Sequence, residues 1–222
     1  MALQDKPVEG VVTDIRSHPA GAKGAHISLA ECAERAWKAR MSPRLRAWVT
    51  QVLDKAGVST GGRRQKGQAI LDAYRKKVPY VADPVMGEFM GTPDQVLCLD
   101  EAKGLCIIGA DCDEAAITIA AAMLCIGIPV MIVGTSHKPP HDTPTHVLMA
   151  FQDELEHWVR MDGTTQHPVG QTAHHSREWW YEPGKAQKDS GVGDFVGMSE
   201  KHVGVSAPAS MLDLIYPGLS SR

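Results

Sequence analysis

The stretch GADCDEAAITIAAAMLCIGIPVMIVG, residues 109–134, decides the fold of this chain. After an acidic start it is almost wholly apolar, and the apolar part approaches the length of a bilayer span. Gly127-Ile128-Pro129 argues against a membrane helix, because a proline inside such a run ends the helix. The stretch therefore predicts a buried helix over residues 112–126, a tight turn and a buried strand over residues 130–134.

The start of this predicted helix carries the first candidate for chemistry. Asp111 is a suitable N-cap, and Glu114 three residues later completes a capping box. Cys112 would then lie in the first turn, where unpaired amides and the helix dipole favour an anion and can lower the pKa of a thiol. Asp111, Asp113 and Glu114 act in the opposite direction, because nearby negative charge disfavours a thiolate. A histidinium partner would be needed to outweigh them.

The chain before this stretch is predicted to be helical. Its expected elements are an irregular arm over residues 1–27 and helices over residues 28–39, 43–55 and 65–77. Ser28 and Glu31 form a second capping pair, and Gly57 is a stop signal for the middle helix.

The charge is unevenly distributed along the chain. Residues 1–80 hold 15 Lys and Arg against 7 Asp and Glu, whereas residues 81–222 hold 8 against 19. The basic half could lie on the acidic half or bind an anionic partner, although a solvated basic helix face is the simpler interpretation. The net charge of −3 gives no general attraction to nucleic acid or membrane, and we expect neither as a partner.

Two strands are expected after the central stretch, over residues 145–152 and 156–162. If the loop between them is the polar tripeptide Asp153-Glu154-Leu155, His146 lies directly opposite Asp162 on one face of the hairpin. An Asp beside a His fixes the imidazole tautomer and stabilises its charged form. Helices followed by an antiparallel meander indicate an α+β fold.

These segments together resemble the transglutaminase-like superfamily, a group with a papain-like fold that includes bacterial and phage-encoded members. That family has a Gly-x-Cys-x-(Asp/Glu) segment opening a helix, a Leu-Gly-Ile-Pro turn, a His at the start of a strand, and a later Trp…Leu-Asp-x-Thr strand. The similar segments here are Gly109–Ala116, Leu124–Pro129, Thr145-His146-Val147, Trp158–Thr164 and, upstream, Tyr80–Pro84. Ala110 lengthens the Gly-to-Cys spacing by one residue and Met161 replaces the usual Leu, but neither departure removes a catalytic group.

The resemblance implies a papain-like core, a central helix packed on an antiparallel sheet, with Cys112 as nucleophile, His146 as base and Asp162 as orienter. It covers residues 65–165, so we expect the catalytic core there. A helical segment over residues 1–64 would precede the core, and an irregular extension over residues 166–222 would follow it, all in one compact unit.

The oxyanion donors are less defined than the nucleophile. The amide of Cys112 is one candidate, since it lies at a helix start where no intrahelical acceptor exists. A second donor would come from an upstream polar or aromatic side chain. Gln95 and Tyr80 are the candidates, although a structural role is the simpler interpretation of each.

The function expected from these residues is thiol-dependent acyl chemistry on an amide bond, by a protease, amidase, deamidase or transglutaminase. The substrate would be a protein or peptide, and the chemistry needs no cofactor. The alternative is a non-catalytic structural or assembly protein, for example of a phage particle, that uses the same fold to bind partner proteins.

The remaining features are interpreted as structural. His137, His141 and Asp142, with His146, lack the spacing of a zinc site, so we expect no metal. Trp179-Trp180-Tyr181 is interpreted as packing or, if exposed, as a recognition patch. His174-His175 is interpreted as a surface pair. The cysteines expected to be core or neutral thiols are Cys32, Cys98, Cys106 and Cys125.

The location of the protein is predicted from its cysteines and its first residues. Five cysteines, with no CxxC pair, favour a reducing compartment. The start MALQDKPVEG lacks the apolar stretch of a secretory signal. We therefore expect a cytoplasmic or virion-associated protein.

Overall fold

The computed structural model describes residues 22–82, 90–99, 109–136, 143–175 and 177–185, and they form an α+β fold. Within these ranges the chain has five helices and one four-stranded antiparallel sheet. The helices are α1 (Ala22–Ala39), α2 (Pro43–Lys55), α3 (Arg63–Lys77), α4 (Pro93–Val96) and α5 (Cys112–Leu124). The strands are β1 (Val130–Ser136), β2 (His146–Gln152), β3 (Trp158–Met161) and β4 (Arg177–Tyr181).

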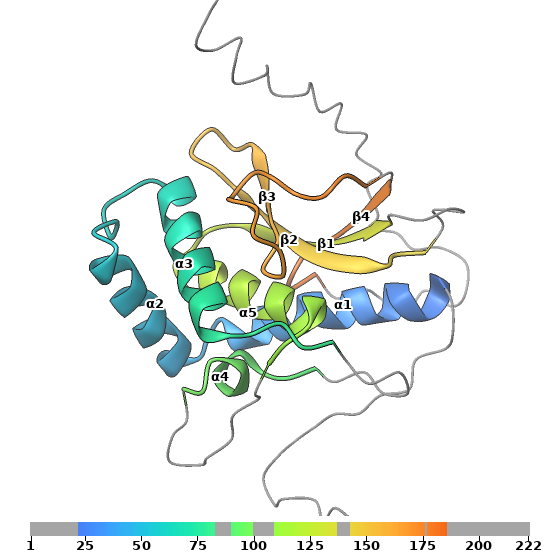
Figure 1. Cartoon of the computed structure of the whole chain (residues 1–222), viewed down its shortest axis with the longest axis horizontal. Helices are drawn as coiled ribbons and strands as arrows, with labels where there is room; N and C mark the ends of the chain where they lie inside the picture. Colours follow the sequence, from blue (N-terminus) through green and yellow to red (C-terminus); the bar gives the residue numbers. More distant parts are fainter. Residues whose placement is uncertain (1–21, 83–89, 100–108, 137–142, 176, 186–222) are drawn as a thin grey trace, which may run out of the picture.

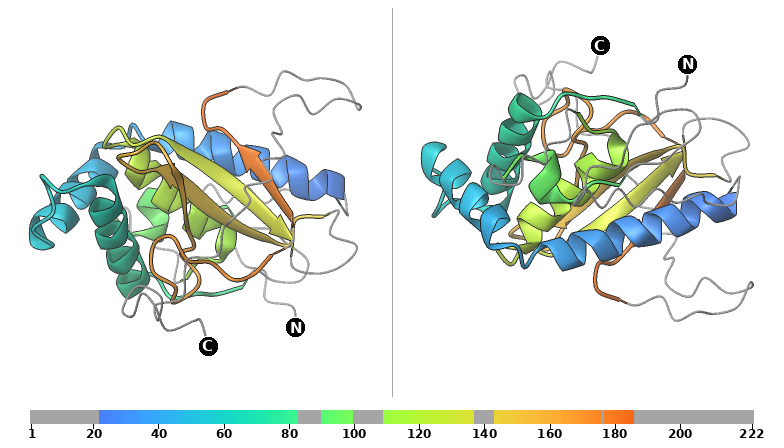
Figure 2. Two further views of the ribbon diagram at one scale, coloured as in Figure 1. Left: turned by 90° about the horizontal axis from the view of Figure 1, so that it is seen from above. Right: turned by 90° about the horizontal axis from the view of Figure 1, so that it is seen from below.

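The sheet has the strand order β3-β2-β1-β4, with every neighbouring pair antiparallel. Helices α1 and α5 pack on one face of it, while α3 lies beside the hairpin of β2 and β3 and α2 packs against α3 (Figures 1 and 2). The opposite face carries a smaller apolar cluster, made of Val133, Leu148, Ala150 and Trp180.

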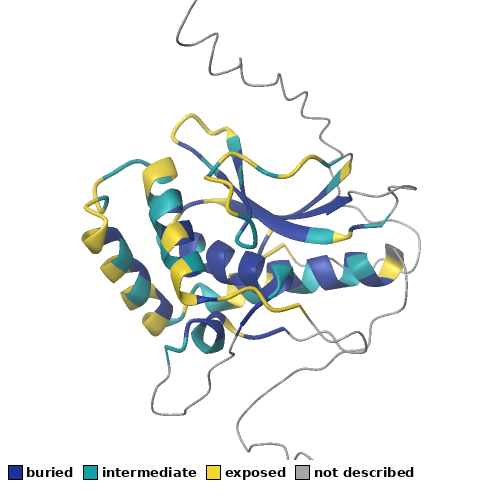
Figure 3. Ribbon diagram, viewed as in Figure 1, coloured by how far each residue is buried: buried dark blue, intermediate teal, exposed yellow. Residues whose placement is uncertain are grey.

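Helix α5 is the centre of the core, as its sequence predicts. It is buried from Asp113 to Met123, and Figure 3 shows it as the most continuously buried helix. Gly127 ends the segment with φ of +77°, a left-handed conformation that glycine adopts without steric cost. Strand β1 follows it, so the apolar run folds back as a helix, a turn and a strand. Among the described residues, no helix is both long and apolar enough to cross a membrane.

The N-terminal helices differ from the expectation only at their starts. Helix α1 begins at Ala22, so Ser28 is a buried residue inside it rather than its N-cap, and the expected irregular arm is wrong for residues 22–27. Helix α2 has the predicted bounds, is capped by the Ser42 hydroxyl, which accepts from the Leu45 amide, and is followed by Gly57 at φ of +68°.

The hairpin register differs from the predicted one by two residues. Gln152 pairs with Trp158, not with Glu156, so the loop is longer than the expected tripeptide. The buried Asp153 carboxylate explains the longer loop: its Oδ1 accepts the amides of Leu155 and His157, and Glu156 takes a φ of +63°. An even shift keeps every side chain on its predicted face. It makes His146 and Asp162 diagonal rather than direct neighbours.

Strand β4 was not expected, because residues after Gly163 were interpreted as irregular. Residues 177–181 instead pair with β1 and form an edge of the sheet. Trp179, Trp180 and Tyr181 are all buried there, so their interpretation as packing residues is confirmed.

Two of the minor interpretations are wrong. Cys98 is disulfide-bonded, not a neutral thiol. His175 is half-buried and hydrogen-bonded to Glu178, so His174-His175 is not a pair of surface side chains.

Candidate active site

The N-terminus of α5 has the predicted capping geometry. The Asp111 carboxylate accepts from the Asp113 amide at 2.9 Å, and Glu114 Oε2 accepts from the Asp111 amide at 3.1 Å. Cys112 is therefore the first residue of a buried helix, and the helix holds its backbone in place.

The Cys112 thiol lies between this helix end and strand β2. Its Sγ donates to Asp113 Oδ1 at 3.6 Å and also has a hydrogen bond with the backbone of Val147, the residue after His146. Burial raises the pKa of the thiol well above its ordinary value, and the charges of Asp113 and Asp111 raise it further, while Val147 acts against them. The resting thiol is thus protonated, and the dipole of α5 does not activate it unaided.

His146 and Asp162 form a direct hydrogen bond. His146 is the first residue of β2, Asp162 follows the last residue of β3, and His146 Nε2 lies 2.9 Å from Asp162 Oδ2. Diagonal neighbours in an antiparallel pair remain within reach of long side chains, which is why the register shift does not separate them. Asp162 is only 2% exposed, whereas the His146 side chain is 21% exposed.

The Asp162 carboxylate is held from both sides. Its Oδ1 accepts the amide and the hydroxyl of Thr164, at 2.9 and 2.8 Å. Burial opposes ionisation of this group, but the hydrogen bonds and charge of His146 and the hydrogen bonds of Thr164 outweigh it, so the pKa of Asp162 lies below its ordinary value. An ionised Asp162 is thus fixed in the orientation that receives a proton of the imidazole.

Two glycines allow the segments of the site to approach each other. A side chain at Gly163 would lie 2.7 Å from Ile119 of α5, and one at Gly109 would lie 2.2 Å from Val81. Gly109 thus lets the segment before Cys112 lie against residues 79–81, where Ala110 exchanges backbone hydrogen bonds with Pro79 and Val81.

The two candidate oxyanion side chains have different surroundings. Tyr80 forms an isolated parallel bridge with Ala110, two residues before Cys112, and its side chain is 58% exposed. Gln95 lies on α4, and its Oε1 accepts the amide and the hydroxyl of Thr92 in a local capping box. Of the two, Tyr80 is the one beside the nucleophile segment.

Glu114 has a second contact that sequence reasoning missed. Its Oε1 accepts the Gly91 amide at 3.1 Å, so one buried carboxylate joins the segment before α4 to the start of α5. Burial raises the pKa of Glu114 to about 8, and the charge of Asp111 contributes, although the amides of Gly91 and Asp111 act against this. A Glu at the third helical position predicts the cap, but nothing in the sequence indicates Gly91.

A second polar cluster joins the two edge strands of the sheet and was also missed. Glu178 on β4 accepts from Arg160 on β3, at 2.5 and 2.8 Å, and from His175 and Trp180. The two edge strands are therefore bridged across the apolar cluster. Both ring nitrogens of His175 face oxygen acceptors, and the hydrogen bond with Glu178 chiefly raises its pKa.

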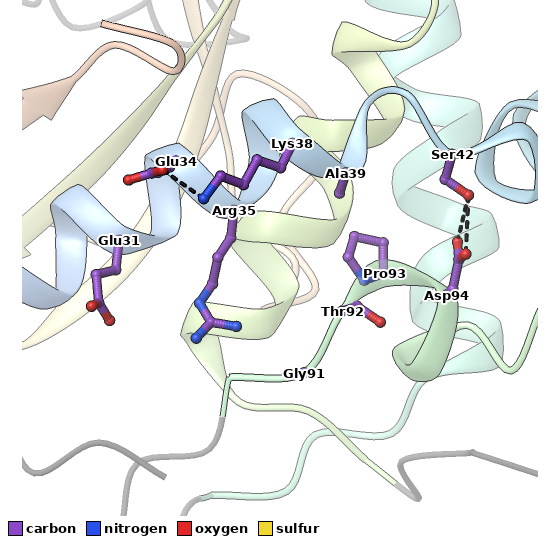
Figure 4. Close-up of a pocket in the computed structure, with 10 residues that line it drawn as sticks. All are labelled: Glu31, Glu34, Arg35, Lys38, Ala39, Ser42, Gly91, Thr92, Pro93 and Asp94. Atoms are coloured by element: carbon purple, nitrogen blue, oxygen red, sulfur yellow. Dashed lines mark hydrogen bonds and ion pairs between the residues drawn. The ribbon is translucent and has the colours of Figure 1, made fainter. Parts of the chain in front are cut away.

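A cavity of about 470 Å3 lies between α1 and the segment before α4 (Figure 4). Its polar groups bond to one another: Lys38 to Glu34, Ser42 to Asp94, and Arg35 to the carbonyl of Met90. The remaining lining residues include Glu31, Ala39, Gly91, Thr92 and Pro93. The catalytic candidates are not among its lining residues. One lining residue, Gly91, donates its amide to Glu114 of α5.

Possible metal ligands in the described part of the chain are Asp111, Cys112 and Asp113, whose ligand atoms lie within 4.8 Å of one another. Asp111 already accepts the Asp113 amide, and a thiol ligand would have to lose a proton that its surroundings favour. The histidines considered from sequence, His137 and His141, lie outside the described residues, as does Asp142.

No protein-family model and no curated protein matches the chain. Among solved structures, the chain is similar to a provisionally assigned protease from Parabacteroides distasonis, with a TM-score of 0.45 and 12% identity. The match covers 68% of this chain and 30% of that protein, so the chain spans about a third of its length.

Proposed function

We propose that the protein is a thiol-dependent enzyme that acts on amide bonds, with Cys112 as nucleophile, His146 as general base and Asp162 as orienter. The observation that carries the proposal is the hydrogen bond between His146 and the buried Asp162. Cys112, at the start of a buried helix, has a hydrogen bond with the backbone of Val147, the residue next to His146. Cys112 and His146 belong to α5 and β2, so rigid elements position both, and Asp162 directly follows β3.

The raised pKa of Cys112 determines how such an enzyme would work. Because the resting thiol is neutral, attack requires the base to remove the proton as the Sγ–carbon bond forms. Nε2 of His146 is engaged with Asp162, so Nδ1 is the nitrogen that takes this proton. The imidazolium then donates it to the leaving amine, and a thioester remains on Cys112.

Release of the acyl group completes the reaction. His146 removes a proton from water as the water oxygen attacks the thioester. The carbon–sulfur bond then breaks, the Cys112 sulfur takes the proton from His146, and a carboxylic acid is released. A primary amine in place of water gives a new amide by the same steps. The oxyanion of each tetrahedral intermediate would be stabilised by the Cys112 amide, with the Tyr80 side chain as the second donor.

A non-catalytic binding module is the second candidate. The observation that favours it is the thiol itself, which donates to Asp113 and lies beside two carboxylates that disfavour the thiolate. In that case His146–Asp162 would be a structural hydrogen bond and the surface of the domain would contact partner proteins.

Incubation of the protein with a defined peptide pool and a labelled primary amine tests the proposed reaction. Mass spectrometry distinguishes new amino termini, deamidated glutamines and amine adducts, which correspond to protease, deamidase and transglutaminase activity. We expect one of these products with the wild type and none with Cys112→Ala. Equal product patterns for the two proteins would support the binding module.

A further inference from the structure

Arg75 of α3 lies behind the carboxylate that orients His146. Its Nη2 donates to the backbone carbonyl of Asp162 at 2.6 Å and to that of His167 at 2.7 Å. One nitrogen of a basic helix thus spans the two ends of the turn that follows β3. Arg75 contacts the backbone of Asp162, while Thr164 and His146 contact its carboxylate.

Helix α3 holds this turn at a second place and the hairpin at its far end. The amide of Val169 donates to Gln68 at 2.9 Å, and Arg64 donates to the buried Asp153 carboxylate at 3.0 and 3.1 Å. The basic front half of the chain therefore lies partly on the acidic back half, one of the arrangements that the charge distribution allows. Arg64 bonds a carboxylate in the hairpin loop, whereas Arg75 bonds backbone carbonyls at the other end of the hairpin, beside the orienter.

We propose that Arg75 is a positioning residue of the site: it fixes the carbonyls of Asp162 and His167 and so keeps the Asp162 carboxylate aimed at His146. The effect of Arg75 on catalysis rests on the proposed function, whereas its effect on the orientation of Asp162 does not. Asp162 stands outside β3, beyond the last ladder pair at Met161, so the sheet alone does not fix its backbone. The Arg75 contact supplies that constraint from a separate element.

Burial of the Arg75 guanidinium in this position also costs free energy of folding. Its Nε is buried without a hydrogen-bond partner in the described structure, and an unpaired buried donor costs about 1–3 kcal/mol. The Nη2 contacts must offset this cost. They join a charged donor to two carbonyls, and hydrogen bonds to charged groups are stronger than those between neutral groups.

The effect of Arg75 on the orientation of Asp162 is tested by observing the His146–Asp162 hydrogen bond. The imidazole proton of His146 that faces Asp162 is expected to give a slowly exchanging downfield proton resonance, identified by its loss in His146→Gln. In Arg75→Met we expect that resonance to broaden, or to move toward the chemical shift of an imidazole proton that exchanges with solvent. Arg75→Lys, which keeps one cationic donor, should restore part of the signal.

Arg64→Met is the matched control, since it removes an arginine of the same helix that bonds to the same hairpin. It should leave the His146 resonance unchanged. Arg75→Gln, with a single neutral donor, replaces Arg75→Met if circular dichroism shows that variant to be unfolded. An unaltered His146 resonance in a folded Arg75→Met or Arg75→Gln protein would overturn the inference.

Acylation of Cys112 by p-nitrophenyl acetate measures the catalytic consequence. We expect Arg75→Met to slow it roughly tenfold to a hundredfold, the effect of a small misplacement of a catalytic group, and Arg64→Met to leave it unchanged. If the resonance changes but no variant or wild type is acylated at Cys112, the positioning role stands and the proposed function fails. If wild type is acylated and Arg75→Met equals it in both measurements, only the inference fails.

Discussion

Asp162 has a donor at each of its three oxygen atoms. His146 bonds Oδ2, Thr164 bonds Oδ1, and Arg75 bonds the backbone carbonyl. The Asp-Gly-Thr sequence accounts for one of these donors, Thr164, and its Gly163 permits close approach to α5. The third donor comes from 87 residues away, and nothing in the local sequence predicts it.

Glu114 gives a prediction about stability at the residue scale. Its pKa is raised from 4.5 to about 8, so between these values the native state holds a proton that the unfolded state has released. The free energy of unfolding should therefore fall as the pH rises through this range. The loss contributed by Glu114 is several kcal/mol, since each unit of pKa shift corresponds to about 1.4 kcal/mol.

Glu114→Gln removes this titration and keeps one acceptor oxygen for an amide. We expect the difference in free energy of unfolding, wild type minus variant, to decrease between pH 5 and pH 8 in urea titrations. Contributions of other titrating groups, such as His26 and His175, cancel in that difference. Parallel stability curves for the two proteins would show that Glu114 titrates normally.

Among the elements, α2 has the predicted bounds, α5 and β1 differ from theirs by two residues at one end, and the β2–β3 hairpin was predicted in the wrong register. The apolar run with its Gly-x-Pro turn predicts a helix, a turn and a strand. The start of the helix and the position of the turn agree with the structure. The hairpin loop was placed on the most polar tripeptide, whereas hydrogen bonds inside the loop decide its length. Because the shift is even, the faces were predicted correctly and the pairs were not.

Glu156→Gly tests the observed register. Glu156 has a φ of +63° in the loop, a conformation that disfavours residues with a side chain, so glycine should leave stability unchanged or raise it by up to about 1 kcal/mol. Urea unfolding measures the change, with Glu154→Gly as a control in the same loop. A loss of about 1 kcal/mol, as expected for glycine in a strand, would favour the shorter loop instead.

Strand β4 was missed for a different reason. Its sequence, REWWY, is short and follows a loop-rich stretch, and its pairing partner β1 lies about 45 residues earlier in the chain. The polar cluster of Arg160, His175 and Glu178 depends on that pairing, so it was also not predictable. Elements defined by local periodicity were found, and those defined by long-range pairing were not.

In the whole molecule, one rigid layer of helices and one sheet bring three candidate groups to the same region. The sequence predicted their identity and order, and the structure adds the His146–Asp162 bond and a thiol that is protonated at rest. Such a thiol reacts slowly unless a base assists it, so the dependence of its reactivity on His146 separates an enzyme from a binding module.

The most direct test is acetylation of Cys112 by p-nitrophenyl acetate near neutral pH, located by peptide mass spectrometry in wild type, Cys112→Ala and His146→Ala. We predict one acetyl group on Cys112 in the wild type and none at this position in Cys112→Ala. In His146→Ala we expect a rate lowered roughly a hundredfold or more, the usual contribution of a general base. Equal rates in wild type and His146→Ala, rising only above about pH 8.5 as for an unassisted thiol, would contradict this prediction.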